Sequence, residues 1–231
     1  MSKTVVILQP SYLPWLGFFD QLYQSDVFVV YDDVQYDKNG WRNRNRIKTE
    51  RGAQWLTVPV YIKNKPKINE VMIDNKNDWP QKHLQAIKTN YGKAPYFKKY
   101  YDGLSQILLK KHERLLDLNL ELIEFFAKEL GIEREICLSS KLNVGGEKIS
   151  RLINICKHLG ADRFFEGAAG KNYIQKEEFD KSGVRIDFQD YQHPVYRQLF
   201  GDFAPYLSII DLLFNEGENS LKIILSSNKN S

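Results

Sequence analysis

The sequence predicts an α/β fold of the Rossmann-like type, with a mainly parallel sheet, an inserted β-hairpin and a helical segment. Two observations support this fold class. Thr4–Leu8 and Val27–Tyr31 are short, β-rich and apolar, as is typical of strands buried on both faces of a parallel sheet. Leu16–Gln24 lies between them with the pattern of a short helix, and this strand–helix–strand order favours parallel pairing.

A β-hairpin is expected to interrupt this parallel pattern. Trp55–Ile62 and Ile68–Ile73 have the composition of strands, and the lysine-rich sequence KNKPK joins them as a turn. Pro59 lacks a backbone N–H, which suits a strand at the edge of a sheet. The two segments are therefore predicted to pair with each other outside the parallel sheet.

A group of helices is predicted after the hairpin. Trp79–Tyr91 carries Pro80 in its first turn, a position that suits proline. Tyr96–Lys111 and Arg114–Leu130 follow, and the apolar residues of the second recur at helical spacing. Residues 79–131 could therefore form a helical subdomain within the larger domain.

The rest of the chain alternates between strands and helices, as expected of an α/β protein. The predicted elements are a strand at Ile136–Leu138, a helix at Glu147–Leu159, a strand at Arg163–Glu166, a helix at Gln175–Lys181, a strand at Val184–Phe188, and helices at Pro205–Phe214 and Ser220–Leu225. No internal repeat or low-complexity linker divides the sequence. We therefore predict a single α/β domain over residues 1–231.

The composition is ordinary for a soluble globular protein, with 42% hydrophobic and 27% charged residues. No stretch approaches the roughly 20 apolar residues of a membrane helix, and Gln9-Pro10 ends the first apolar run too early for a signal peptide. Cys137 and Cys156 show no metal-binding or redox spacing, which is typical of reduced core thiols. We therefore expect a cytoplasmic protein that does not insert into a membrane.

The most distinctive charge pattern is the run Lys38–Arg51, KNGWRNRNRIKTER, which holds six cations and one acid. Guanidinium groups match phosphate oxygens with paired donors, and Trp41 offers a flat face for a base or a sugar ring. The net charge of +4 is modest, so this run indicates a local anion site more than a surface that coats nucleic acid. The alternative is a solvated surface loop.

The segment WRNRN within this run alternates arginine with asparagine. In an extended conformation Arg42 and Arg44 would lie on one side of the chain, and Asn43 and Asn45 on the other. One side could then bind phosphate while the other orders the local turn. A purely structural turn is the alternative interpretation.

Three loops leave the carboxyl ends of predicted parallel strands: Gln9–Trp15, Asp32–Arg51 and Gly167–Tyr173. Ligands of open α/β sheets bind outside these strand ends, where the strand order reverses. If the three strands are neighbours, one pocket collects Gln9, Tyr12, Trp15, Lys38, the acidic pair, the WRNRN segment, Lys171 and Tyr173. The loop GAAGKNY, which holds Lys171 and Tyr173, lacks the spacing of a phosphate loop or a dinucleotide fingerprint.

Asp32, Asp33 and His193 are the candidate proton acceptors. The acidic pair ends a strand, so it can supply a general base or an anchor for a sugar hydroxyl or amine; a structural cap is the alternative. His193 can act as a proton shuttle because histidine titrates near neutrality, and a surface-loop histidine is the alternative. The other histidines have no ligand spacing, so we expect no metal.

Five segments of the sequence are similar to those of one known family. They are QPSYLPWLGFF at Gln9–Phe19, DDVQY at Asp32–Tyr36, WRNRN at Trp41–Asn45, the turn Leu159–Ala161 and SIIDLLFN at Ser208–Asn215. The first is the most specific, and together they span nearly the whole chain. On these segments the sequence resembles the WbqC-like protein family.

The resemblance implies a role in bacterial O-antigen, lipopolysaccharide or other surface-polysaccharide biosynthesis, with transfer of glycine or another acyl group to an amino sugar. We therefore expect an acyl- or aminoacyl-transferase that forms an amide on the amine of a nucleotide-linked amino sugar. In this interpretation Lys38, Arg42 and Arg44 hold the diphosphate, Tyr12, Trp15 and Trp41 stack, Asp32 or Asp33 deprotonates the amine, and Gln9 or Lys171 polarises the acyl carbonyl.

The acyl donor stays open, and no tightly bound cofactor is expected. A carrier-protein thioester, coenzyme A, an aminoacyl-tRNA, or ATP plus a free acid would each suit a basic entrance, so an acyl carrier protein or a tRNA is a candidate partner. Two other functions remain. The strand and proline-rich turn are similar to those of nucleotidylyltransferase folds, which favours a ligase that activates an acid with ATP, although Pro14–Gly17 holds no histidine. A non-catalytic nucleotide-sugar or RNA-binding module is the last alternative.

Overall fold

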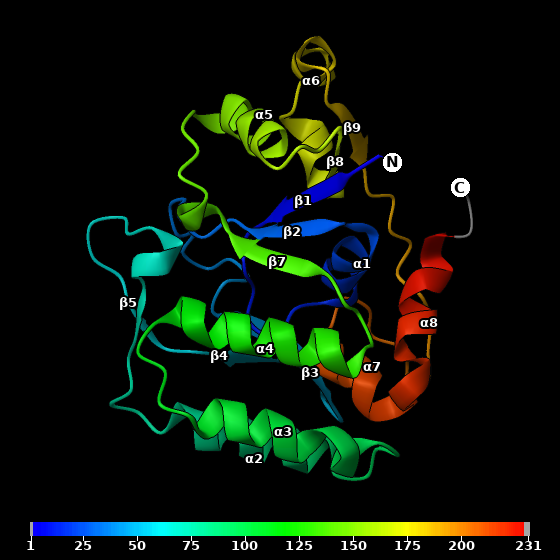
Figure 1. The fold of residues 1–231 in the computed structure, drawn as a ribbon. Helices are drawn as coiled ribbons and strands as arrows, with labels where there is room; N and C mark the ends of the chain where they lie inside the picture. The colour runs from blue at the N-terminus through cyan, green and yellow to red at the C-terminus, as the bar shows by residue number, and fades with distance from the viewer. Residues whose placement is uncertain (1, 229–231) are drawn as a thin grey trace.

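The computed structural model describes residues 2–228, and a five-stranded sheet forms its centre (Figure 1). The strands are, in spatial order, β7 (Glu135–Leu138), β2 (Val27–Val30), β1 (Thr4–Leu8), β8 (Arg163–Glu166) and β9 (Arg185–Phe188). Every neighbouring pair is parallel. In chain order, β1, β2 and β7 lead to one edge of the sheet, and β8 and β9 then lead from β1 to the other edge. The strand order therefore reverses between β1 and β8, as in a Rossmann-like sheet.

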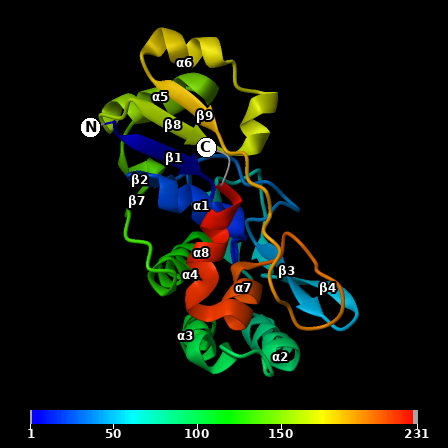
Figure 2. The same cartoon turned by 90° about the vertical axis from the view of Figure 1, so that its right-hand side faces the viewer.

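Helices cover both faces of this sheet (Figures 1 and 2). One face packs against α5 (Lys148–His158) and α6 (Lys176–Ser182), and the other against α1 (Leu16–Gln24) and α4 (Leu115–Glu129). Each face of the sheet has its own hydrophobic core: the first core lies under α5 and α6, and the second lies under α1 and α4. Side chains alternate along β1, so Val5 and Ile7 belong to the first core and Val6 to the second. This two-sided burial explains why the central strands are apolar along their whole length.

The second core also includes the helical segment and the C-terminal helices. The remaining helices are α2 (Trp79–Tyr91), α3 (Phe97–Leu109), α7 (Ile209–Glu216) and α8 (Ser220–Leu225). Helix α3 packs on α2, α4 and α7, and α8 packs on α1. The apolar faces of α2–α4 therefore join one continuous core with the sheet residues Val6 and Phe28.

The inserted β structure differs from the sequence prediction. The predicted pairing of Trp55–Ile62 with Ile68–Ile73 is wrong over most of its length. Strand β4 (Gly52–Thr57) pairs with β3 (Arg44–Thr49), inside the basic run, and only β5 (Val60–Tyr61) and β6 (Met72–Ile73) pair as expected. Ile68–Glu70 forms a 3₁₀ turn.

Two local features explain this difference. Gly52 has a φ of +101°, a conformation that glycine adopts easily, and it lets the chain reverse directly after β3. Pro59 then follows β4 without a backbone N–H to donate, which ends the ladder. The basic run therefore becomes half of a hairpin instead of a free loop.

The other predicted elements are close to those observed, apart from the helix at Pro205–Phe214. Helix α7 begins only at Ile209, after Ser208, whose hydroxyl accepts a 3.4 Å hydrogen bond from the N–H of Ile210. Tyr206 has a φ of +59°, in the left-handed region, so a helix cannot run through it. The remaining 3₁₀ turns are Ser139–Lys141, Ala168–Asn172, Gly217–Asn219 and Ser226–Asn228.

The two cysteines are free thiols, as the sequence predicts. Burial raises the pKa of the Cys156 thiol to about 12, which keeps it protonated at neutral pH. Within residues 2–228, no helix combines the length and the apolarity needed to cross a membrane.

Candidate functional site

A cleft of about 470 Å³ lies beside the loop that follows β1, at the carboxyl edge of the sheet. This volume is within the roughly 300–1,000 Å³ of small-molecule sites. The lining residues are Leu8, Gln9, Ser11, Trp15, Phe18, Gln21, Trp41, Arg42, Asn45, Arg46 and Tyr206. The cleft therefore brings together five of the predicted site residues, Gln9, Trp15, Trp41, Arg42 and Asn45.

Arg42 places a mostly buried charge in this lining. It forms no ion pair with any carboxylate of the described residues, and its Nε is buried without a hydrogen-bond partner. Burial lowers the pKa of Arg42 below its ordinary value, and the nearby Asp37 and Tyr36 only partly oppose this effect. A desolvated cation without a counter-charge is unfavourable, so the cleft suits an anionic ligand.

Gln9 links Arg42 to the loop after β1. An Arg42 Nη1 N–H donates a hydrogen bond to the side-chain oxygen of Gln9. The Gln9 amide nitrogen donates no hydrogen bond to any residue between 2 and 228, and the side chain lines the cleft. Gln9 can therefore donate to a ligand oxygen while Arg42 holds its orientation.

Aromatic rings form the walls of the cleft. The ring centre of Trp15 lies 5.8 Å from that of Tyr206, and it lies 5.4 Å from that of Tyr191. Trp41 lines the cleft from the basic run. Flat rings beside guanidinium groups are suited to a base or a sugar next to phosphate.

Arg46, which the sequence analysis did not select, lines the cleft in place of Arg44. The Arg44 guanidinium donates to the carbonyl of Asn39 and lies 4.4 Å from the ring centre of Trp55. Arg46 shares its period-two spacing with Arg42 and Arg44, and this spacing could have identified it. Tyr206 gave no such signal, because it reaches the cleft from a distant part of the chain.

The two asparagines of WRNRN lie on the buried side of the chain, as the alternation predicts. The Asn43 side chain donates to the carbonyl of Val58 at 2.8 Å, and that of Asn45 donates to the carbonyl of Leu13 at 2.7 Å. Both amides therefore tie the basic run to neighbouring backbone. Asn45 also contributes to the lining of the cleft.

Tyr12 is fully buried and does not line the cleft. Its hydroxyl lies 2.9 Å from Nδ1 of His83, and its backbone N–H donates to the carbonyl of Trp41 at 3.1 Å. Burial lowers the pKa of His83 to about 4, so this histidine is neutral at pH 7. In this structure Tyr12 positions the basic run, and its ring offers no surface to a ligand.

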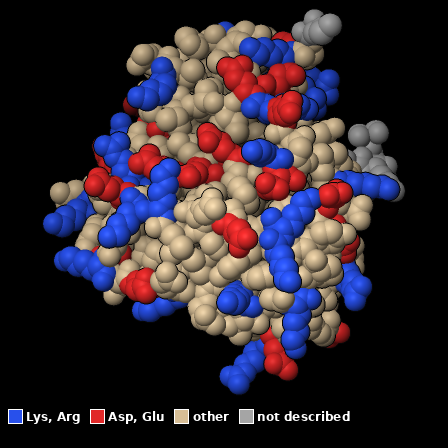
Figure 3. Space-filling view, turned by 60° about the horizontal axis from the view of Figure 1, so that its bottom comes forward, with Lys and Arg blue, Asp and Glu red and all other residues tan. Residues whose placement is uncertain are grey.

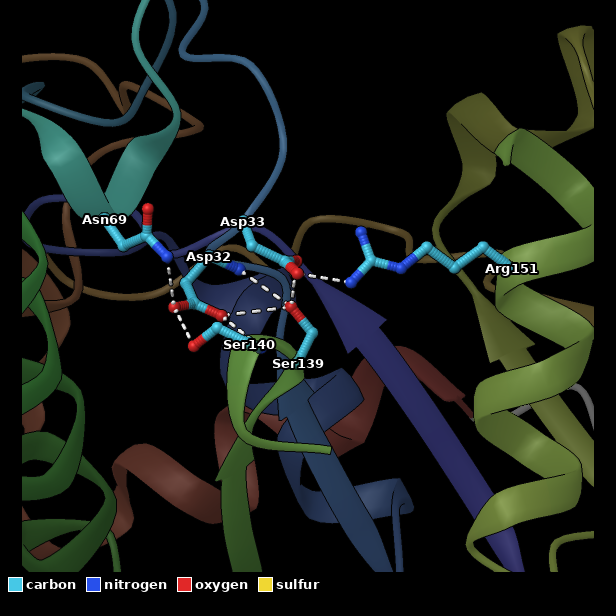
Figure 4. Close-up of polar contacts among 6 residues, drawn as sticks. All are labelled: Asp32, Asp33, Asn69, Ser139, Ser140 and Arg151. Atoms are coloured by element: carbon cyan, nitrogen blue, oxygen red, sulfur yellow. Dashed lines mark hydrogen bonds and ion pairs between the residues drawn. The ribbon is translucent and has the colours of Figure 1, made fainter. Parts of the chain in front are cut away.

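Asp32 lies at the end of β2, in a network of protein donors (Figure 4). Its carboxylate accepts hydrogen bonds from the Ser140 hydroxyl at 2.7 Å, the Ser140 N–H at 2.9 Å and the Asn69 side chain at 3.1 Å. The Ser139 hydroxyl lies 3.0 Å from the same carboxylate. Asp32 lines another recess, of about 660 Å³, and not the cleft beside β1.

Asp33 points to the opposite side and forms an ion pair with Arg151 of α5 (Figure 4). It also accepts a 2.6 Å hydrogen bond from the Ser139 hydroxyl. Partial burial acts to raise the pKa of Asp33, but the hydrogen bonds from Arg151 and Ser139 outweigh it and hold this pKa below the ordinary value. The cation that neutralises Asp33 comes from far along the chain, so the sequence did not reveal it.

Lys38, Lys171 and Tyr173 are exposed and lie outside the cleft lining. The Tyr173 hydroxyl donates a 3.3 Å hydrogen bond to Glu166, at the end of β8. Glu166 is buried, and this burial raises its pKa to about 7. This carboxyl was not among the predicted site residues, because a glutamate that ends a short strand has no distinctive pattern.

His193 contacts a wall of the cleft without lining it. Its ring centre lies 5.0 Å from that of Tyr206, and its Nε2 is buried without a hydrogen-bond partner. Burial lowers the pKa of His193 below its ordinary value. No group of three or more potential metal ligands from His, Cys, Asp and Glu occurs within residues 2–228.

Comparisons with known proteins place the chain in a family. Residues 9–223 match the WbqC-like protein family. The chain is 40% identical over 219 residues to the "Uncharacterized protein Rv1507c" of Mycobacterium tuberculosis (strain ATCC 25618 / H37Rv), covering 93% of this chain and 94% of that protein. No solved structure matches the chain significantly. The chain therefore belongs to the WbqC-like protein family.

Proposed function

We propose that the cleft binds a nucleotide-linked amino sugar and that the protein forms an amide on the amine of this sugar. The observation that carries the proposal is Arg42, a mostly buried guanidinium without a carboxylate partner among the described residues. Together with Arg46 it suits a diphosphate, while Trp15 and Trp41 suit the base and the sugar ring. The family resemblance supports surface-polysaccharide biosynthesis as the setting.

The amide N–H group of Gln9, which donates to no other described residue, supports the acyl-transfer part of the proposal. In the attack of an amine on an activated acyl group, negative charge develops on the carbonyl oxygen, and a fixed donor stabilises it. Arg42 fixes the Gln9 amide with its nitrogen available for this role. Asp32, Asp33 and His193 are the proposed bases, although none of them lines the cleft.

The first test is a thermal-shift series with UDP-, dTDP- and GDP-linked amino sugars. A ligand at about 100 times its Kd stabilises a protein by about 2.7 kcal/mol, which corresponds to a rise in Tm of roughly 5–10 °C for a chain of this size. The matching nucleotide without sugar, and the free amino sugar, are the controls. If no nucleotide-linked amino sugar raises the Tm, the proposed substrate class is wrong.

A ligase that activates an acid with ATP is the second candidate. The strand order β7-β2-β1-β8-β9 favours it, because nucleotides bind where a Rossmann-like sheet reverses its order, beside the carboxyl end of β1. Incubation with ATP and candidate acids distinguishes the two functions. Release of pyrophosphate or phosphate that depends on the acid supports the ligase, whereas an amide product formed from a pre-activated acyl donor without ATP supports the transferase.

A further inference from the structure

The outward face of the β3–β4 hairpin carries aromatic and guanidinium groups beyond the cleft. Arg46 is paired directly with Trp55 in the antiparallel register, so Arg44, Arg46 and Trp55 project from the same face. The guanidinium of Arg44 lies 4.4 Å from the ring centre of Trp55, and that of Arg46 lies 5.7 Å from it. Trp55 nevertheless stays 43% exposed, so much of its surface is available to a partner.

Trp41 extends this surface to the rim of the cleft. Its ring centre lies 5.3 Å from that of Trp55, the two ring planes are inclined by 38°, and Trp41 is itself 41% exposed. Trp41 and Arg46 also line the cleft, whereas Trp55 and Arg44 do not. We call Trp41, Trp55, Arg44 and Arg46 the hairpin platform; Figure 2 shows the hairpin standing out at one side of the molecule.

Exposed cations also lie in neighbouring segments of the chain. They are Lys38 and Arg51 of the basic run, and Lys63, Lys65 and Lys67 of the turn before β6. A β-bridge between Gln35 and Lys67 joins this turn to the segment that precedes the run. None of the five takes part in an ion pair within the described chain. By contrast, lysines, arginines and acids are interspersed over the face that carries α2 and α3 (Figure 3).

We propose that the hairpin platform binds the unpaired 3′ end of an RNA that carries the acyl group as an ester. Exposed indoles stack on any unpaired base, and guanidinium groups and lysines follow its phosphates. A duplex would not suit the platform, since its bases are already stacked on one another. The inference rests on the proposed function, for which it supplies the acyl donor.

The platform and the cleft share Trp41 and Arg46, which places the end of a bound strand next to the sugar site. The amine nitrogen of the sugar attacks the ester carbonyl, a C–N bond forms and the C–O bond to the ribose breaks. The ribose oxygen leaves with the proton lost by the amine. This aminolysis gives an amide and a free ribose hydroxyl, and it needs no oxidant, reductant or ATP.

Fluorescence anisotropy with a labelled single-stranded RNA of roughly ten nucleotides tests the binding step. Trp55→Ala should weaken binding roughly five- to 150-fold, the effect of losing one base–aromatic stack, and Trp55→Phe should restore most of it. Tyr61→Ala is the matched control, because Tyr61 is equally exposed, at 44%, on the next strand. Equal affinity of wild type and Trp55→Ala, or equal affinity for duplex RNA, would overturn the inference.

A second measurement separates this inference from the proposed function. The rise in Tm caused by the nucleotide-linked sugar should be retained in Trp55→Ala and lost in Arg42→Met. The reason is that Arg42 lines the cleft and Trp55 does not. Loss of RNA binding in Trp55→Ala with an intact sugar response supports the platform. A wild-type protein that binds the sugar but prefers polyglutamate to RNA would show that the platform takes acidic protein, and the RNA proposal would fall.

Discussion

The indole ring of Trp15 lies against Gly17, in the first turn of α1. A Cβ atom at position 17 would come within 2.9 Å of Cζ3 of Trp15, and closer still to two other ring atoms. Trp15 is the residue directly before the helix, and its ring is part of the cleft wall. The missing side chain at Gly17 therefore gives the cleft its shape.

Gly17→Ala should displace the Trp15 ring and weaken ligand binding in the cleft. The new methyl group cannot fit beside the indole, so the ring must rotate, while alanine itself suits a helix better than glycine does. We expect the substitution to change the free energy of unfolding only slightly. The rise in Tm caused by the nucleotide-linked sugar should become smaller. Thermal melts with and without ligand measure both effects.

Gly145→Ala is the control for this prediction. A Cβ at Gly145 meets no atom within 4 Å, so the substitution should leave both the stability and the ligand response unchanged. If Gly17→Ala retains the full ligand response, the position of the Trp15 ring is not important for binding.

Arg42→Met should stabilise the protein or leave its stability unchanged, and should weaken ligand binding. Methionine keeps much of the side-chain length but removes a buried charge that has no ion-pair partner among the described residues. Loss of a charge-assisted hydrogen bond costs about 1.5–3 kcal/mol, so the affinity for the ligand should fall by roughly ten- to 150-fold. Urea unfolding and calorimetric titration give the two numbers.

Arg51→Met is the matched control, because Arg51 belongs to the same basic run but is exposed. It should change neither the free energy of unfolding nor the affinity appreciably. A strong loss of stability in Arg42→Met would instead identify Arg42 as a structural residue and weaken the case for an anionic ligand.

Asp33→Asn should lower the stability at neutral pH by roughly 1.5–3 kcal/mol, because Arg151 loses its charged partner. The pKa of Asp33 is lower in the folded than in the unfolded protein, so its stabilising effect is present above its ordinary value of 3.8. That effect disappears as the pH falls through the lowered folded value. The difference between wild type and variant should therefore be large at pH 7 and vanish in strong acid.

An amide-formation assay of the same variant tests whether Asp33 is also a base. If it is, turnover should fall by about 10²–10⁴-fold with little change in sugar affinity. Asp32→Asn, in the neighbouring network, undergoes the same assay. Wild-type turnover in both folded variants would assign the pair a structural role.

The central sheet was predictable because β1 and β2 are apolar along nearly their whole length and a helical pattern lies between them. Thr4–Leu8 and Arg163–Glu166 are strands over the predicted residues, and their carboxyl ends meet at one edge, as parallel pairing requires. The cleft beside β1 was predictable for the same reason. Local composition and the rule for parallel sheets were enough to place Gln9, Trp15 and Arg42 together.

The residues that the sequence did not reveal depend on contacts between distant segments. Arg151 neutralises Asp33 across 118 positions. Tyr206 lines the cleft two residues before Ser208, which forms a β-bridge with Trp15. The hairpin was mispredicted because the charged residues of β3 have the composition of a loop, although the alternation within β3 fits a strand and Gly52 suits the tight turn that follows it.

Glu166→Gln should change how stability depends on pH. Residue Glu166 is 8% exposed, and the pKa of its carboxyl is raised from 4.5 to about 7, mainly by burial. Between these two values the folded protein holds a proton that the unfolded chain has lost, so the stability of the wild type falls as the pH rises. Above pH 7 both states are ionised, and the fall ends.

Glutamine has no carboxyl to ionise, so the variant lacks this fall. The free energy of unfolding of Glu166→Gln, minus that of the wild type, should grow from pH 4.5 to pH 7, by up to about 3 kcal/mol, and then stay constant. Urea unfolding at several pH values measures this difference, with the exposed Glu178→Gln in α6 as the control. A difference that does not change with pH would show that Glu166 is already ionised in the folded protein, held in that form by its hydrogen bond from Tyr173.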